Sequence, residues 1–302
     1  MSPPASDGLV RLRLGLSYDG TEFSGWATQP GRRTVQGCVE SALGQTLRLA
    51  SAPRLTCAGR TDAGVHALGQ VAHVDLAGAL GTELIRRRRR IEQLLPADVV
   101  LHEIGVAPEG FDARFSALSR TYRYLVSDGI TDPLRRHDVV THPRALDVSA
   151  MSRAAAPLVG EHDFLPFCRP RVGASTVRCL RSLEVRRDAA IEDRVVVAVA
   201  ADAFCHHQVR FLVGALLAVG DGRRPDTWPA SVLDAGVRDG SVPLAPAHGL
   251  TLLRVDYPAD SALAERARLT RRRREPVAVP PGSPAAATAR DAPGQRPPND
   301  GA

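Results

Sequence analysis

Lysine is absent from this 302-residue chain, and all 39 of its basic residues are arginine. Set against 33 acidic residues, they give a formal net charge of +6. Arginine keeps its charge, binds phosphate through two parallel N–H groups and stacks on bases, so this balance favours a nucleic-acid partner. A codon bias would explain arginine in place of lysine, but not the positive excess. Half of that excess lies in residues 260–302, which hold eight arginines and five acidic residues.

Cysteines and aromatic residues are few, and long apolar runs are missing. The five cysteines are odd in number and form no CxxC pair, which argues against a disulfide framework and a cysteine-type zinc site. No apolar run approaches the roughly 20 residues of a membrane helix. The opening MSPPASDGLV lacks the basic start and apolar core of a signal peptide. We therefore expect a cytoplasmic protein with no membrane contact.

A glycine-rich loop followed by a strand occupies residues 58–75, AGRTDAGVHALGQVAHVD. Gly59 and Gly64 flank a short polar cluster that contains Asp62, and such glycines permit a tight loop or close approach to a ligand. The alternation from Gln70 onward predicts a strand. Asp62 is therefore expected in a loop beside strands, where catalytic side chains are often found. For such a motif alone, a turn or helix-capping aspartate is the commoner role.

The order of strand and helix patterns predicts an α+β protein with two related halves. Strands are expected at residues 10–17, 70–75, 99–106, 120–126, 183–185, 195–200 and 252–256. Helices are expected at residues 35–47, with Thr34 as N-cap, and at 82–95, 146–158 and 204–219, with Gly220 just beyond the last. Residues 159–164 are expected to form a loop.

Composition also sets the expected domain boundaries. Residues 1–8 read as a disordered lead-in, and residues 260–302 as a disordered tail rich in arginine, proline and alanine. Between them we expect an N-terminal domain at 9–112, which carries the Asp62 loop, and a C-terminal domain at 113–259. Tyr122 and Tyr124 are two residues apart in a strand and should share one of its faces.

Several stretches, taken in order, resemble the tRNA pseudouridine synthase A family over roughly residues 9–258. They are YDGTEFSGW at 18–26, GRTDAGVH at 59–66, FDARFSA at 111–117, GEHDF at 160–164 and HHQVRFLVG at 206–214. The resemblance implies two α+β domains whose antiparallel sheets join, flanked by helices, with the active-site cleft between them. It implies isomerisation of uridine to pseudouridine at positions 38, 39 and 40 of the tRNA anticodon stem-loop, by a homodimer that needs no cofactor and no metal.

The resemblance also implies a role for five residues. Asp62 matches the nucleophile, and Arg210 matches a helix arginine that would keep this carboxylate ionised. Tyr122 matches the tyrosine that stacks on the flipped uracil, with its hydroxyl near C5. Arg60 matches the residue that fills the space left by the flipped base, and Leu250 matches an apolar wall of the uracil slot.

Three positions depart from the family pattern and bear on RNA contacts more than on catalysis. Ala27 follows Trp26 where glutamine is usual, Glu92 stands where asparagine is common, and Asp112 replaces histidine. We carry no function onto these positions from the family.

Three other interpretations compete with this one. A metal-dependent nuclease or deaminase would use clustered cysteine and histidine, but His206 and His207, if helical, point about 100° apart and cannot readily share an ion. The HxE and PCxxC deaminase pattern is absent. A non-catalytic RNA-binding module is the second alternative, although aromatic residues make up only 4% of the chain. A pseudouridine synthase that acts on another RNA is the third. Replacing Asp62 separates an enzyme from a binding module, and chelation identifies a metal enzyme.

Overall fold

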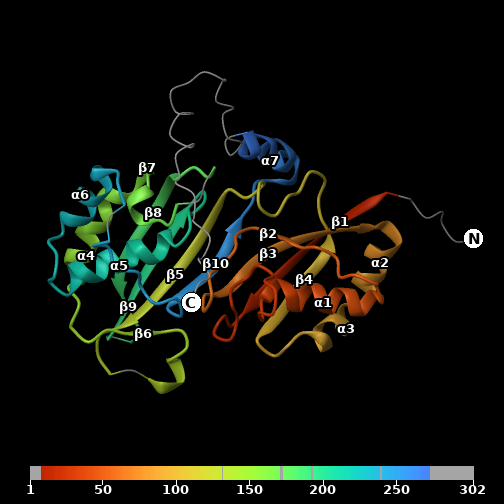
Figure 1. The fold of residues 1–302 in the computed structure, drawn as a ribbon, viewed down its shortest axis with the longest axis horizontal. Coiled ribbons are helices and arrows are strands. Elements are labelled where there is room, and N and C mark those ends of the chain that lie inside the picture. The colour runs from red at the N-terminus through yellow and green to blue at the C-terminus, as the bar shows by residue number, and fades with distance from the viewer. Residues whose placement is uncertain (1–7, 131, 171–172, 192, 239, 273–302) are drawn as a thin grey trace, which may run out of the picture.

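The computed structural model describes residues 8–130, 132–170, 173–191, 193–238 and 240–272. Within these ranges the strands form one sheet in the order β4-β1-β3-β10-β5-β9-β8-β7, with β2 beside β3 and β6 beside β5 (Figure 1). The strands are β1 (Leu9–Tyr18), β2 (Thr56–Cys57), β3 (His66–Ala77), β4 (Val99–Val106), β5 (Ser119–Ser127), β6 (Val140–Thr141), β7 (Gly160–Asp163), β8 (Val177–Arg187), β9 (Arg194–Ala201) and β10 (Leu250–Asp256).

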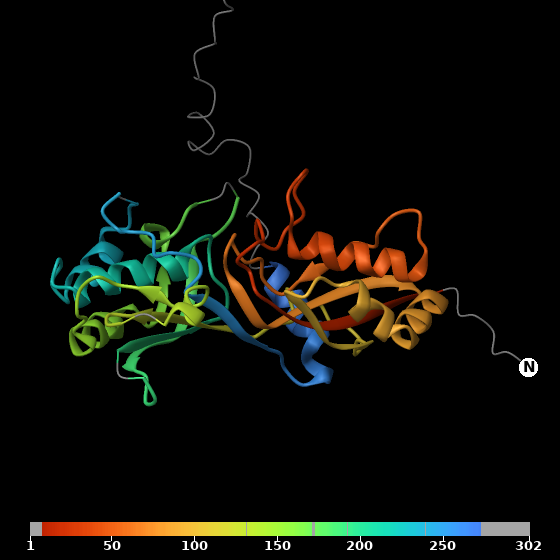
Figure 2. The ribbon, with the colours of Figure 1, turned by 90° about the horizontal axis from the view of Figure 1, so that it is seen from below.

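Helices cover the sheet, and two of the long ones, α1 and α5, lie along the same face (Figure 2). The helices are α1 (Val35–Leu47), α2 (Gly78–Arg86), α3 (Arg88–Leu94), α4 (Val148–Ala155), α5 (Gln208–Gly220), α6 (Trp228–Ala235) and α7 (Leu263–Arg272), with 3-10 turns at Pro133–Arg135, Ala156–Leu158, Leu165–Phe167 and Asp260–Ala262. Thr34 caps α1 as predicted, because its side chain accepts a hydrogen bond from the backbone N–H of Gly37. None of these helices has the length and apolarity that crossing a membrane requires.

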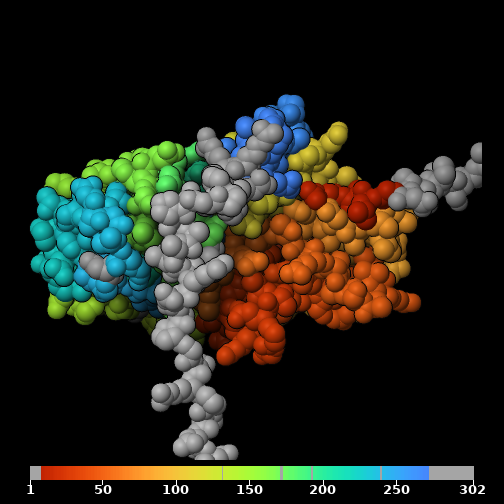
Figure 3. All heavy atoms as spheres, turned by 45° about the horizontal axis from the view of Figure 1, so that its top comes forward, coloured from red at the N-terminus to blue at the C-terminus, as the bar shows by residue number. Residues whose placement is uncertain are grey.

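The two halves of the chain meet where β10 returns to the first half. β10 is antiparallel to β5 and parallel to β3, with Thr251 opposite His66 and Leu252 opposite Ala67. The halves appear as two lobes in Figure 3, red to orange for the first and green to cyan for the second. This confirms the predicted α+β class and the joining of the sheets, although the β3–β10 junction is parallel. The junction lies just after the Asp62 loop, so it places that loop against the second half.

The sheet buries side chains on both faces, because residues along a strand alternate between them. On β3, Ala72 and Val74 belong to the main core, while Val71 packs in a smaller cluster with Phe111 and Leu263. Leu263 belongs to α7, so α7 packs against the smaller cluster.

The prediction of a disordered tail from residue 260 is wrong for residues 260–272. Residues 260–262 form a 3-10 turn and Leu263–Arg272 a helix, held where Arg271 forms an ion pair of 2.6 Å with the buried Asp112. Composition suggested disorder, but Leu263 and Ala267 supply an apolar face that the sheet can bury. Residues 1–7 and 273–302, over which we also predicted disorder, lie outside the described residues.

Three other local predictions need correction. The helix expected at 82–95 breaks at Arg87, so α2 packs on β1 and α3 on β4. The helix expected from 204 begins at Gln208, and Gly220 is its last residue. Residues 160–163, expected in a loop, form the edge strand β7 beside β8. The apolar β9 is central in the sheet, between β5 and β8.

Candidate active site

Asp62 lies in the loop between β2 and β3, and this loop is braced from behind by residues 20–26. The backbone N–H of Trp26 donates to the carbonyl of Thr61 at 3.0 Å, and Gly64 has a φ of +77°, which glycine adopts without strain. Gly20 packs so closely that a Cβ there would lie 2.1 Å from the carbonyl oxygen of Val65. The backbone of the Asp62 loop is therefore fixed by close packing, while the Asp62 side chain remains 24% exposed.

A buried polar network lies under this loop. The hydroxyls of Tyr18 and Thr61 are 2.9 Å apart, and the amide nitrogen of Gln70 donates to the Tyr18 oxygen and to the carbonyl of Gly59. Burial raises the pKa of Tyr18 above its usual value, so this tyrosine stays neutral. Because the buried polar groups are paired, the network fixes the first part of the glycine-flanked segment, at Gly59 and Thr61.

The turn before α5 brings two histidines to Asp62. His207 precedes the helix in the left-handed region, with a φ of 66°, so its ring stacks beside that of His206, with centroids 3.8 Å apart. Their Nε2 atoms lie 3.6 Å (His206) and 3.3 Å (His207) from carboxylate oxygens of Asp62. The prediction that these two side chains diverge is wrong, because both residues precede the helix and the backbone of His207 is not helical.

Arg210 lies one turn into α5, and its guanidinium is 3.4 Å from Oδ2 of Asp62. Its Nε donates to the carbonyl of Ala245 at 2.8 Å, which fixes the side chain against the segment before β10. The structure thus brings together the aspartate and the arginine that the family resemblance paired. Only 14% of the Arg210 side chain is exposed, so solvent screens this pair less than a surface ion pair.

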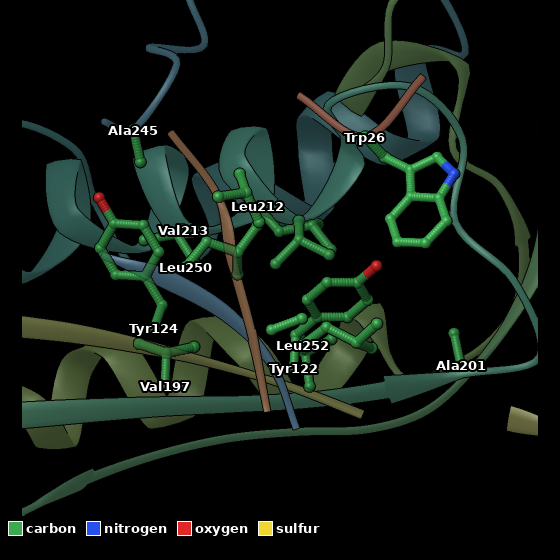
Figure 4. Close-up of a cluster of buried hydrophobic side chains, with 14 of the residues drawn as sticks. Trp26, Tyr122, Tyr124, Val197, Ala201, Leu212, Val213, Ala245, Leu250 and Leu252 are labelled. Atoms are coloured by element: carbon green, nitrogen blue, oxygen red, sulfur yellow. The ribbon is translucent and has the colours of Figure 1, made fainter. Parts of the chain in front are cut away.

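Tyr122 projects from β5 into the core below the Asp62 loop. Its ring meets Phe204 edge-on, at a centroid distance of 5.3 Å, and a Cβ on Gly59 would lie 4.0 Å from its hydroxyl. Burial raises the pKa of Tyr122. The Arg120 charge opposes this shift, and the Asp62 charge adds to it. Figure 4 shows Tyr122 and Tyr124 standing on the same face of the strand, which confirms the predicted alternation.

The other two predicted residues differ in their surroundings. Leu250 is buried at the start of β10, opposite Tyr124, and its backbone N–H donates to the carbonyl of Ala247. Ala247 in turn approaches Gly64, since a Cβ on Gly64 would lie 3.3 Å from its side chain. Arg60 is exposed and makes no hydrogen bond or ion pair with the described part of the chain. Leu250 is therefore linked to the Asp62 loop through Ala247, and Arg60 is exposed two residues before Asp62.

Sequence reasoning missed Arg120. This side chain on β5 is 4% exposed, and its guanidinium donates to the carbonyls of Ala58, Asp202 and Arg114 at 2.6–2.8 Å. Ala58 comes four residues before Asp62, and Asp202 comes four residues before His206. Arg120 therefore fastens together the two segments that build the site. The available signal was that Arg120, one of two arginines in β5, alternates onto the same strand face as Tyr122 and Tyr124, where a buried charge needs several partners.

A separate hollow of about 860 Å³ lies between the start of β1, residues 106–112 and α7. None of the five predicted site residues lines it, and its walls carry the Arg11–Asp75 and Arg271–Asp112 ion pairs. It is therefore distinct from the surroundings of Asp62.

Comparison with known proteins bears on this site directly. A family model described as tRNA pseudouridine synthase matches residues 154–258. A tRNA pseudouridine synthase A from Frankia casuarinae is 59% identical over 278 residues, which cover 91% of this chain and 98% of the relative. Proteins of the same name from Streptomyces griseus and Mycobacterium leprae are 55% and 47% identical, covering 88% and 89% of this chain and 95% and 97% of their own.

The fold, the arginine-paired aspartate above a buried tyrosine and the family match together define a pseudouridine synthase. The identities narrow this further: the chain belongs to the tRNA pseudouridine synthase A family. The resemblance seen in the sequence is thereby confirmed.

Proposed function

We propose that this protein isomerises uridine to pseudouridine at positions 38, 39 and 40 of the tRNA anticodon stem-loop, with Asp62 as the nucleophile. The observation that carries the proposal is the placement of the Asp62 carboxylate, 24% exposed and 3.4 Å from the Arg210 guanidinium, in a chain of this family. A carboxylate can act as a nucleophile, and the Arg210 guanidinium beside it fixes its position.

The reaction requires little beyond placement and charge. The N1–C1′ bond of uridine breaks, the uracil turns, and C5 bonds to C1′, after which the proton on C5 leaves. Atoms and electrons balance without a redox partner or energy source, and we propose no cofactor. Asp62 acts as the nucleophile during the exchange at C1′, while the base is flipped out of its stack. Tyr122 offers a ring against the uracil and a neutral hydroxyl, Leu250 an apolar wall, and Arg60 a charge for the RNA backbone.

We further propose that the partners are tRNA and a second copy of this chain, and that the protein works in the cytoplasm. The homodimer and the division into domains at 9–112 and 113–259 follow from the family resemblance. The basic charge, all of it from arginine, supports binding to RNA phosphates, and the affinity of such binding falls steeply as the salt concentration rises.

The test is release of tritium from tRNA transcripts that carry 5-tritiated uridine in the anticodon arm, since pseudouridine formation expels the hydrogen on C5. Asp62→Asn keeps the shape of the side chain and removes its charge. We expect turnover to fall by at least about a thousandfold, as for loss of a nucleophile, with tRNA binding retained.

Asp226→Asn is the matched control, because Asp226 makes a surface ion pair with Arg153 and should keep full activity. Binding without conversion by either the wild-type or the Asp62 variant would instead indicate an RNA-binding module. Conversion of another RNA, but not of these uridines, would move the proposal to a different target.

A further inference from the structure

The two histidines beside Asp62 are held in an uncommon arrangement. His207 has a left-handed backbone, which costs a non-glycine residue about 1–2 kcal/mol and is found most often at functional sites. The backbone carbonyl of His206 accepts a hydrogen bond of 2.9 Å from the N–H of Arg169, which fixes the turn. The result is that two consecutive side chains face the same carboxylate.

The donor atoms lie close enough together to bind one metal ion. Asp62, His206 and His207 each offer one ligand atom, and these atoms lie within 4.8 Å of one another. Bonds of about 2.0–2.1 Å at tetrahedral angles place neighbouring ligands about 3.4 Å apart. His207 lies 3.3 Å from Oδ2 of Asp62 and His206 lies 3.6 Å from Oδ1, so each imidazole is near that spacing from one of the two carboxylate oxygens. A fourth position would remain for water, because the side chains are 15–24% exposed.

We infer that Asp62, His206 and His207 bind a divalent transition-metal ion, zinc above all, and that the bound ion inhibits the enzyme. Binding of the ion stands on the geometry alone. Inhibition rests on the proposed function, because an ion on the Asp62 carboxylate would occupy the nucleophile and the space needed by the flipped uridine.

The charges around the site limit how tightly it binds. Arg210 lies 3.4 Å from the same carboxylate oxygen as His207 and repels any cation placed there. We expect an affinity well below that of a structural zinc site, and a reversible effect.

The ligand set also determines which ions bind. Two imidazoles and one carboxylate suit zinc, cobalt, nickel and copper, whereas magnesium prefers six oxygen ligands. Magnesium supplied with tRNA should therefore leave the site free, so that zinc inhibits in the presence of a large excess of magnesium.

Direct binding is measured first, with cobalt(II) as the probe, because tetrahedral cobalt absorbs strongly in the visible range. We expect one ion per chain for wild-type protein, and at least a tenfold weaker association for His206→Ala, His207→Ala and Asp62→Asn. His102→Ala is the control, since His102 is exposed on β4 and bonded to Ser17. Arg210→Gln should bind about tenfold more tightly, because it removes the repelling charge. Equal binding by wild type and both histidine variants would refute the site.

Inhibition is then measured by tritium release with zinc and excess magnesium. We expect zinc to raise the apparent KM for tRNA, EDTA to restore activity fully, and each histidine variant that remains active to need at least tenfold more zinc. Zinc bound at this site without any inhibition would overturn the inhibitory role. If wild-type protein bound cobalt as expected but released no tritium, the proposed function would fail and the metal site would stand. If Asp62→Asn stayed active, Asp62 would not be the nucleophile. If wild-type protein was active but bound no cobalt, the metal site alone would be refuted.

Discussion

Arg120 offers the sharpest test of how the site is held, because one buried side chain joins both of its segments. Replacing it with methionine keeps much of the volume and removes three hydrogen bonds to backbone carbonyls. A hydrogen bond to a charged group contributes about 1.5–3 kcal/mol, but losses at one residue are not additive. Methionine also removes the cost of burying a charge. We therefore expect a loss of about 3–5 kcal/mol in the free energy of unfolding, the usual cost of breaking a buried polar network.

The assay for Arg120→Met is urea and thermal unfolding together with tritium-release kinetics. At about 2–4 °C per kcal/mol, the melting temperature should fall by about 6–20 °C. Where the variant is folded, kcat should fall while the KM for tRNA stays within a few-fold, because Arg120 positions the Asp62 loop and does not reach the RNA. Arg120→Lys should be intermediate, since one ammonium cannot span three carbonyls.

Arg254→Met is the matched control for Arg120→Met. Arg254 lies on the neighbouring β10 and is 69% exposed in its ion pair with Asp256, so its loss should cost less than about 1 kcal/mol. If the free energy of unfolding of Arg120→Met lay within about 1 kcal/mol of the wild-type value, as expected for the control, Arg120 would not hold the two segments together.

Two further predictions concern the support of the loop and the pH dependence of stability. Gly20→Ala would place a Cβ 2.1 Å from the Val65 carbonyl, so kcat should fall at least about tenfold, whereas Gly105→Ala, with nothing within 4 Å, should leave kcat unchanged. Equal kinetics for the two variants would contradict close packing at Gly20. The Arg187 guanidinium is the largest cause that lowers the pKa of Asp128 below its ordinary value of 3.8. This ion pair therefore stabilises the fold above pH 3.8. Its contribution is lost as the pH falls through the lowered pKa. Asp128→Asn should therefore cost about 1.5–3 kcal/mol in urea unfolding at pH 7 and progressively less at acid pH; a cost independent of pH would contradict the assignment.

Local patterns in the sequence determined most of the secondary structure and the family. Alternation located β1, β4, β5 and β9, because a strand exposes its faces in turn. The glycine-flanked GRTDAG loop drew attention to Asp62, but only the family resemblance favoured catalysis over the commoner turn or capping role. Arg210 and Tyr122 followed only from the family resemblance, because a helix arginine or a strand tyrosine by itself is ordinary.

What tertiary structure alone decided depends on contacts between distant segments. The parallel β3–β10 junction joins residues almost two hundred positions apart, and no local pattern encodes such a partner. Packing against the sheet turned the start of an apparently disordered tail into α7. A left-handed backbone at His207 reversed the expected divergence of the two histidines, because one dihedral angle redirects a side chain that helical geometry would have sent elsewhere. The sequence thus pointed to Asp62, and the fold decided which charges and donor atoms surround it.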